Sequence, residues 1–316
     1  MENKQRILKE KLKFLGIVKE AVKITCKNPY FIIFTCLTSL PLLFSLFMYE
    51  SLFIQTLTEA AKVLHEEEAK SYKNCLFCSS SKALRVLDHL IDQVSHNFLL
   101  LILSHLGIIH LCDFFNTVAA VNSASVIHAG EKTLNLKEMF IEHVMDSRLK
   151  GPLITSIYTL LLTSILSVGL LSLLIYTFVM TASSFPLLVI VFLVMFVGLL
   201  RQYLEWGAVW ELGTVVSILE EKEGDVALVI AAYLSRGNRG IGILLMICCV
   251  LWRLGLRILC LFVAMDGGVS KMLIIVIQVC LVGLANIIKW VSFVVYYVDC
   301  KKLILENGQG QGVSSL

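Results

Sequence analysis

Six long apolar segments alternate with shorter polar segments along the chain. They cover about residues 30–55, 97–121, 153–181, 186–208, 240–265 and 272–298. Each is about as long as the roughly 20 residues that a helix needs to cross the hydrocarbon layer of a bilayer. Because that layer offers no water to backbone groups, such a run predicts a helix rather than an open strand. The pattern therefore predicts an all-α protein, a polytopic membrane helix bundle of about six transmembrane helices.

The amino-terminal segment, residues 1–29, has a different pattern. Its leucines and valines recur at helical spacing, and its lysines take other faces of the same helix. The apolar positions are Leu8, Leu12, Leu15, Val18 and Val22. This predicts a cytosolic amphipathic helix over 5–27, ended by the proline at position 29. Such a helix either lies on the membrane surface or packs against the cytosolic ends of the bundle.

The remaining segments complete the predicted organisation. A six-helix transmembrane domain over 30–302 contains a polar extracytosolic loop at 57–96, and a glycine- and glutamine-rich disordered tail follows at 303–316. The short connection between the third and fourth spans predicts that they are antiparallel neighbours. The fourth apolar pattern runs on to about Leu219, so we expect its helix to project from the bilayer, to tilt, or to bend at Gly207 or Gly213.

Composition narrows the class of protein further. Hydrophobic residues make up 57% of the 316 positions and charged residues only 16%, against roughly a quarter in a soluble domain. A soluble protein could not cover so much apolar surface with so few charges. The net charge of +3 is too small to indicate direct nucleic-acid binding. The expected surroundings are the lipid bilayer, with anionic lipid headgroups and cytosolic or membrane proteins as candidate partners.

The distribution of lysine and arginine predicts the orientation. Eighteen of them lie in the segments that share a side with the amino terminus, and six lie on the other side. Positive residues concentrate on the cytosolic side, so both termini are expected in the cytosol. The protein is thus predicted to be a multi-pass integral protein of the endoplasmic reticulum, another endomembrane or the plasma membrane. In the extracytosolic loop, Cys75 and Cys78 could form a local disulfide.

Several short motifs resemble a plant family of multi-pass transmembrane proteins of unknown function. They are Leu15-Gly-Ile-Val-Lys-Glu-Ala-Val-Lys-Ile24, Lys27-Asn-Pro29, Ser147-Arg-Leu-Lys-Gly-Pro-Leu-Ile-Thr-Ser-Ile-Tyr158, Val215-Val-Ser-Ile-Leu-Glu220 and Tyr296-Tyr297-Val298. Some members of that family are called polyadenylate-binding-protein-binding proteins. The resemblance implies an architecture rather than a reaction. Any contact with that partner would be between proteins, through a cytosolic segment. Glu221-Lys222-Glu223 and Ala231 depart from the family pattern.

Four charged residues fall inside the predicted spans and form a candidate intramembrane polar network: Asp113, Arg253, Arg257 and Lys289. A charge in the bilayer costs several kcal/mol, so each needs a partner or a cavity. Asp113 and Lys289 lie at matching depths, each about 25 Å from the extracytosolic end of its helix. We therefore predict that these two residues pair. Glu205 or Glu211, or a lipid phosphate, would then face the arginines.

The sequence contains no motif that points to an enzyme. His105 and His110 are five residues apart, so on an α-helix they do not share a face as metal ligands, and we expect them to be core histidines. No nucleophile–base pattern, phosphate loop or dinucleotide fingerprint is present, so no catalytic residue, cofactor or metal is predicted.

Two functional interpretations remain. The first is a structural, regulatory or scaffolding membrane protein, whose amphipathic segments 5–27, 135–149 and 224–236 contact lipid headgroups or partners. The alternative is a transporter or channel for a small solute or lipid, which uses the intramembrane charged residues. A dry and fully paired bundle favours the first interpretation, and a water-filled cavity that reaches the charges favours the second. We expect the intramembrane charges to pair with one another inside the bundle, which favours the first interpretation.

Overall fold

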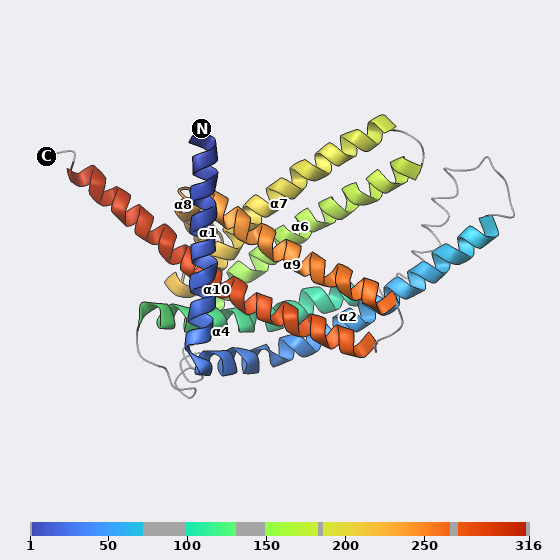
Figure 1. Cartoon of the computed structure of the whole chain (residues 1–316), viewed down its shortest axis with the longest axis horizontal. Helices are drawn as coiled ribbons and strands as arrows, with labels where there is room; N and C mark the ends of the chain where they lie inside the picture. The colour runs from blue at the N-terminus through green and yellow to red at the C-terminus, as the bar shows by residue number, and fades with distance from the viewer. Residues whose placement is uncertain (1, 72–98, 131–148, 183–185, 266–270, 314–316) are drawn as a thin grey trace. The chain divides into compact units, whose positions relative to one another are not determined.

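The computed structural model describes residues 2–71, 99–130, 149–182, 186–265 and 271–313 (Figure 1). Within these ranges the regular structure is helical and contains no strand, which confirms the all-α class. The elements are α1 (Glu2–Lys27), α2 (Pro29–Ser71), a π-helical turn η1 (His105–Ile109), α4 (His110–Ala129), α6 (Lys150–Ala182), α7 (Pro186–Glu220), α8 (Gly224–Ser235), α9 (Arg239–Met265) and α10 (Lys271–Val313). Residues 99–104 are also helical and lead into η1.

Among the residues that the structure describes, six helical stretches are long and apolar enough to cross a membrane. They are Pro29–Thr56, Leu99–Ala129, Lys150–Thr181, Leu187–Glu220, Arg239–Cys260 and Met272–Glu306. The shortest has 22 residues and the longest 35, so each exceeds the length that hydrocarbon requires. The number of apolar helices is the one that the sequence predicts, and it is consistent with a membrane-embedded protein.

The helices divide into two compact units. The first unit comprises Met1–Leu43, Cys112–Leu162 and Tyr203–Leu316, and the second comprises Phe44–Leu111 and Thr163–Gln202. The first unit therefore holds α1, α8, α9 and α10 completely, together with parts of α2, α4, α6 and α7. The second unit holds the remaining parts of the shared helices and the π-helical turn.

The core of the first unit is built where three helices approach closely. A Cβ at Gly242 of α9 would lie 3.1 Å from Tyr296 Oη of α10 and 3.2 Å from the Cβ of Ala208 of α7. Tyr296 is fully buried, and its hydroxyl donates to the backbone carbonyl of Asn238 at 3.1 Å. Any side chain here would press on both neighbours, so Gly242 permits the close spacing of these helices.

In the second unit, the outer parts of α6 and α7 pack side by side. The rings of Tyr176 and Phe192 stack with centroids 5.7 Å apart. A Cβ at Gly169 would lie 3.1 Å from Leu199. Position 176 faces 192 and position 169 faces 199, so the two segments run in opposite directions. This confirms the predicted antiparallel neighbours.

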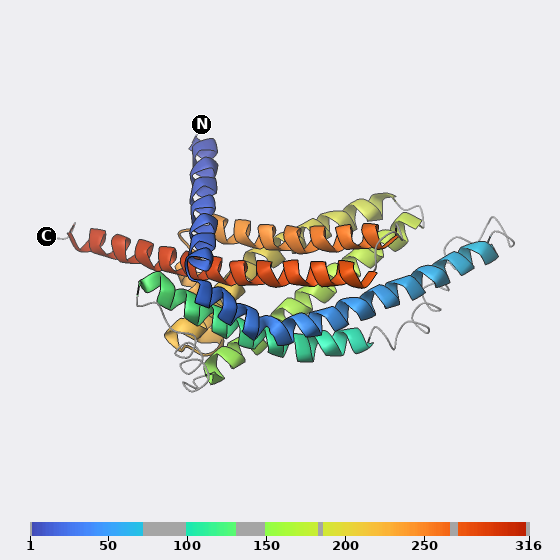
Figure 2. The same cartoon turned by 60° about the horizontal axis from the view of Figure 1, so that its bottom comes forward.

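Helix α1 is amphipathic as predicted, but with a different buried face. Ile17, Ala21 and Ile24 are buried in the core of the first unit, whereas Leu15 is 61% exposed and Val22 is 40% exposed. Figure 2 shows α1 crossing α9 and α10 steeply. Of the predicted stripe, Val18 packs against this core, whereas Leu15 and Val22 do not, because the segment has apolar positions on two faces.

The junction between α1 and α2 forms as the sequence predicts. Asn28 is the one non-helical residue between them, and its side-chain oxygen accepts the backbone N–H of Tyr30 at 3.0 Å. Proline suits the first position of the next helix, since its missing N–H has no partner there in any case. The chain can therefore turn sharply after α1.

The helices differ from the predicted boundaries at three places. The first apolar stretch ends at Thr56, close to the predicted end at 55, and α2 continues as a helix to Ser71, because residues 57–71 are rich in helix formers and contain neither glycine nor proline. The tail predicted to be disordered from 303 is helical to Val313, and its start is held because Leu303 packs near Gly237. Helix α7 runs without a break to Glu220, past the predicted span end near 208, and Gly207 and Gly213 leave room for Met246 and Leu228.

Two predictions fall outside the described residues. Cys75 and Cys78 are not described, so the predicted disulfide stays a prediction. The same holds for the amphipathic segment 135–149, of which all but the last residue is outside the described ranges.

Candidate functional site

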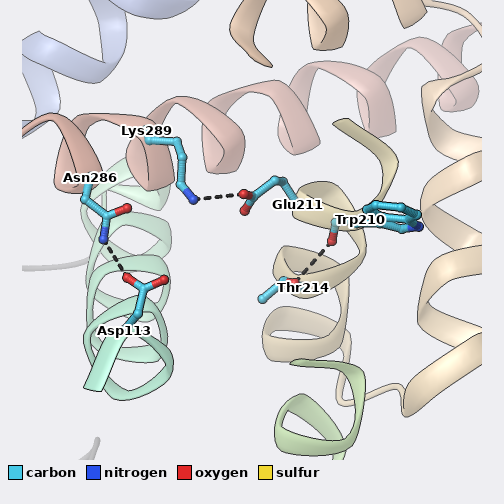
Figure 3. Close-up of polar contacts among 6 residues, drawn as sticks. All are labelled: Asp113, Trp210, Glu211, Thr214, Asn286 and Lys289. Carbon is cyan, nitrogen blue, oxygen red and sulfur yellow. Dashed lines mark hydrogen bonds and ion pairs between the residues drawn. The ribbon is translucent and has the colours of Figure 1, made fainter. Parts of the chain in front are cut away.

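A group of polar side chains lies in the interior of the first unit, on three different helices (Figure 3). Asn286 of α10 donates its amide N–H to Asp113 Oδ1 of α4 at 2.7 Å. Lys289, one turn further along α10, donates to Glu211 Oε1 of α7 at 2.9 Å. Residues three apart on a helix share a face, so α10 directs both side chains toward its neighbours. We call Asp113, Glu211, Asn286 and Lys289 the polar cluster.

The ion pair of the cluster is mostly removed from solvent. The side chain of Lys289 is 9% exposed and that of Glu211 is 24% exposed. The ammonium group of Lys289 also lies 3.9 Å from the centroid of the Trp290 ring, which adds a cation–π contact. Two charges this far from water are tolerated only as a pair, because removing one partner leaves the other buried and uncompensated.

The predicted pair between Asp113 and Lys289 is wrong. Asn286, rather than Lys289, stands opposite Asp113, and the long side chain of Lys289 reaches across to α7. From the sequence, the fourth span was expected to end near 208, and Glu211 was offered as a partner for the arginines rather than for Lys289. Because α7 continues to Glu220, Glu211 is in fact an interior residue of a helix. The sequence signal that indicates the full length of α7 is the apolar pattern, which continues without a break to Leu219.

The two arginines are not part of the cluster as predicted. Of the two acids that the sequence offered as their partners, Glu211 pairs with Lys289 and Glu205 pairs with Arg239 at 3.5 Å. Arg253 is exposed on the surface of the unit and Arg257 is half-buried. Of the four residues predicted to form the network, Asp113 and Lys289 belong to the polar cluster, each with a partner that was not predicted.

A layer of hydroxyl and amide groups adjoins the cluster on the side of α2. Asn116, three residues after Asp113, is 1% exposed, and its Oδ1 accepts Ser39 Oγ at 2.7 Å and Thr38 Oγ1 at 3.4 Å. Nothing in the sequence indicated Ser39 as the partner of Asn116. The contact depends on how α2 is rotated about its axis, which periodicity in a nearly all-apolar helix does not reveal.

Some buried polar atoms of the first unit have no hydrogen-bond partner among the described residues. They are Asn116 Nδ2, Ser123 Oγ, Asn238 Nδ2, Gln278 Oε1, Asn286 Oδ1 and Trp290 Nε1. Each such atom costs about 1–3 kcal/mol when left unsatisfied. Two of them, on Asn116 and Asn286, belong to residues that touch or adjoin Asp113. The region around Asp113 thus contains hydrogen-bonding atoms that no described group satisfies.

A second set of polar contacts ties α6, α7 and α8 together. Thr155 Oγ1 and Ser217 Oγ lie 2.9 Å apart, and the backbone N–H of Gly224 donates to Thr155 Oγ1 at 2.9 Å. Gly224 has φ +52°, a conformation that favours glycine. Both hydroxyls are fully buried and are occupied by backbone or hydroxyl partners. This arrangement fixes a turn and offers no activated nucleophile.

The histidines require a correction. His105 is exposed rather than a core residue, and its ring lies 5.7 Å from that of Tyr49. The turn from His105 to Ile109 is π-helical, and the backbone N–H of His110 donates to the carbonyl of His105. The spacing argument assumed an α-helix, which this turn does not follow. Among the described residues, no three or more His, Cys, Asp or Glu side chains are grouped to hold a metal.

The family is decided by a match that covers almost the whole chain. A domain of unknown function, DUF8558, matches residues 1–310. The chain belongs to this family. The DUF8558 domain includes both compact units and all six apolar helices. No curated protein and no solved structure matches the chain.

Proposed function

We propose that this DUF8558 protein is a multi-pass membrane protein with a structural, regulatory or scaffolding role, whose α1 and α8 bind an anionic cytosolic leaflet. The observation that carries the proposal is the two-faced character of α1. Its inner face, with Ile17, Ala21 and Ile24, packs into the core of the first unit. Its outer face exposes Leu15 and Val22 beside exposed lysines.

The direction of α1 supports a position in the membrane interface. If α9 and α10 cross the bilayer, a helix that crosses them steeply runs nearly parallel to the membrane plane (Figure 2). Lys19, Lys23 and Lys27 are exposed along this helix. Each basic residue near an anionic leaflet contributes about 1 kcal/mol of attraction. An in-plane helix with apolar and basic residues on its free face is the usual form of an interfacial anchor.

Helix α8 has the same division into two faces. Ala227, Ala231 and Leu234 are buried, whereas the apolar or aromatic side chains of Val226, Val229 and Tyr233 are exposed. The guanidinium of Arg236 lies 5.8 Å from the centroid of the Tyr233 ring. Tyrosine beside arginine suits the headgroup region, where one end of the ring is apolar and the other is wet. A second interfacial element strengthens the attachment.

The internal pairing of charges supports a structural role over catalysis. Lys289 is paired with Glu211, and Asp113 accepts a hydrogen bond from Asn286. These contacts join α4, α7 and α10. We therefore propose a non-enzymatic protein with both termini in the cytosol. The resemblance to the plant transmembrane family supports the same architecture, and contact with a cytosolic partner protein would use the free faces of α1 or α8.

The test places an environment-sensitive fluorophore on the outer face of α1. Leu15→Cys or Val22→Cys in a cysteine-free chain is labelled and reconstituted in lipid nanodiscs. A blue-shifted emission is expected with phosphatidylserine, because the probe enters the interface. Glu20→Cys, on another exposed position of α1, is the matched control and should keep an aqueous spectrum. Identical aqueous spectra at all three positions, with and without phosphatidylserine, would overturn the proposed attachment.

One observation favours transport as a second candidate function. Asn286, Asn116 and Gln278 are buried and each has a polar atom without a partner among the described residues. Gln278 lies two turns before Asn286 on α10, so the two can share a face. A row of such groups could line a path for a small polar solute. Uptake of a radioactive solute into proteoliposomes, abolished by Asn286→Leu, would support this candidate over the structural role.

A further inference from the structure

Two charged side chains in the apolar helices of the first unit have no charged partner among the described residues. Asp113 of α4 receives the neutral amide of Asn286. Arg253 of α9 is exposed and takes part in no described ion pair. The two side chains form no ion pair with each other, although both belong to the first unit. Each copy of the chain therefore carries one unpaired negative charge and one unpaired positive charge.

Asp113 and Arg253 lie at nearly the same level of the unit. Gly242 of α9 is opposite Tyr296 of α10, since a Cβ there would lie 3.1 Å from the tyrosine hydroxyl. From that point α9 and α10 run side by side in opposite directions (Figure 2). Arg253 is eleven residues beyond Gly242, which is about 17 Å of helical rise. Asn286, which binds Asp113, is ten residues before Tyr296, or about 15 Å in the same direction.

The common level is near the middle of a bilayer. Asp113 is about 21 Å of helical rise from one end of the apolar stretch Leu99–Ala129 and about 24 Å from the other. Arg253 is about 21 Å from the start of α9 and about 18 Å from its end. Arginine reaches the headgroups from positions near the end of a helix, whereas a deeper charge normally faces a specific partner. The missing partner of each charge is therefore a group inside the bilayer rather than a lipid phosphate.

Both charged groups can be reached from outside the unit. Arg253 is exposed, and Asp113 is only half-buried. Asn286 contacts the Oδ1 atom of Asp113 and leaves the Oδ2 atom without a described hydrogen bond (Figure 3). The Oδ2 atom is not among the enclosed polar atoms of the unit, so it has accessible surface. A guanidinium and a carboxylate with such access can form a short, charge-assisted pair.

Other acids inside the described apolar helices are not available to Arg253. Glu205 and Glu211 each pair with a cation of the first unit. Glu50 of α2 is 8% exposed, so its carboxylate is enclosed. A second copy of the chain, in contrast, offers Asp113, which has the opposite charge, an accessible oxygen and the matching depth. Contact of α9 with α9 would set two arginines against each other, so the second copy must present α4.

We propose that two copies of this chain associate in the membrane through an ion pair between Arg253 of one copy and Asp113 of the other. In a two-fold dimer the same surface of both copies is used, so this pair forms twice. The amide of Asn286 keeps its hydrogen bond to Oδ1, and the arginine takes Oδ2. The inference rests on the proposed insertion of the helices in a bilayer, but not on the attachment of α1 and α8 to lipid headgroups.

The experiment measures Förster energy transfer between donor-labelled and acceptor-labelled copies of the full chain in proteoliposomes. Transfer is expected between parent copies. It should be lost when both copies carry Arg253→Gln and when both carry Asp113→Asn, because no complete pair can then form. A mixture of Arg253→Gln copies with Asp113→Asn copies should recover transfer, because Asp113 of the first can meet Arg253 of the second. Mixing could not restore an ion pair that forms within one chain.

The controls separate loss of the pair from loss of the fold. Arg239→Gln removes the exposed pair with Glu205 and should keep full transfer. Arg253→Lys keeps the positive charge, so it should retain transfer, and it serves if Arg253→Gln does not fold. Recovery in the mixture would itself show that both variants fold.

Several outcomes would overturn the proposal. They are no transfer between parent copies, full transfer when both copies carry either variant, and no recovery in a mixture of variants that unfold at the same temperature as the parent. Loss with Arg253→Gln but not with Asp113→Asn would also overturn it, since the arginine would then pair with an acid of a different protein. Glycosylation mapping reports insertion separately, so an inserted but monomeric chain would contradict the dimer alone.

Discussion

Lys289 of α10 donates to Glu211 of α7 at 2.9 Å, and the two side chains are largely buried. This contact joins helices that are far apart in the sequence. Removing one member leaves the other charge buried without a partner, which typically costs about 3–5 kcal/mol. The pair should therefore be sensitive to single substitutions and tolerant of the paired replacement.

The first prediction tests this pair by a double-mutant cycle. Glu211→Leu and Lys289→Met should each destabilise the folded chain by about 3–5 kcal/mol, and the double variant should recover most of that loss. The free energy of unfolding in mixed detergent micelles is the measurement. Asp113→Leu with Lys289→Met should show no such recovery, because these residues do not contact each other. If Asp113→Leu with Lys289→Met recovered the stability instead, Lys289 would pair with Asp113 rather than with Glu211.

The exposed pair of Glu205 and Arg239 provides the comparison. Its atoms are 3.5 Å apart, and its side chains are 38% and 50% exposed. Solvent screens such a pair, so Glu205→Gln should change the free energy of unfolding by less than about 1 kcal/mol. A cost as large as that of Glu211→Leu would show that Glu205 is buried by something other than the described contacts.

The second prediction concerns the spacing of α7, α9 and α10 at Gly242. A Cβ there would lie within 3.2 Å of both Ala208 and Tyr296. Gly242→Leu should destabilise the first unit by about 1–3 kcal/mol or more, because the larger side chain overpacks the junction. Gly255, on the same helix, has no atom within 4 Å of its Cβ position. Gly255→Leu should therefore be neutral or slightly stabilising, since leucine favours helix more than glycine does.

Both variants can be scored by thermal unfolding in the same detergent. Equal losses at the two positions would show that leucine disturbs α9 wherever it is placed. That result would remove the argument that Gly242 permits the close spacing of the helices.

The sequence predicts the number of apolar helices and their approximate positions, because about twenty consecutive apolar residues are enough to identify each one. It does not predict which residues touch. Glu211 was assigned to the arginines rather than to Lys289, because periodicity in an apolar helix does not show how α7 is rotated toward α10. The stripe on α1 was misassigned because Leu15 and Val22 are as apolar as the buried Ile17 and Ile24. Apolarity alone cannot distinguish a face that meets protein from one that remains free.

The third prediction separates the two faces of α1. Ala21 is fully buried, so Ala21→Asp would place an unpaired charge in the core of the first unit. It should lower the free energy of unfolding by several kcal/mol. Leu15→Asp, on the exposed face, should leave unfolding in detergent within about 0.5 kcal/mol of the parent chain. A large loss from Leu15→Asp would show that the outer face is already covered by protein.

The fourth prediction tests the proposed orientation by glycosylation mapping in microsomes. An Asn-X-Ser acceptor placed in the 57–96 segment should be modified, because that segment is expected in the lumen. The same acceptor placed after the last residue of the chain, Leu316, should remain unmodified, because that end is expected in the cytosol. Six spans require both termini to share a side, so an acceptor placed before Met1 should behave like the one at the carboxyl end. Modification at only one terminus would require an odd number of crossings, and modification at both would reverse the topology. Modification at the acceptor before Met1 would also remove α1 from the leaflet in which anionic lipids are concentrated.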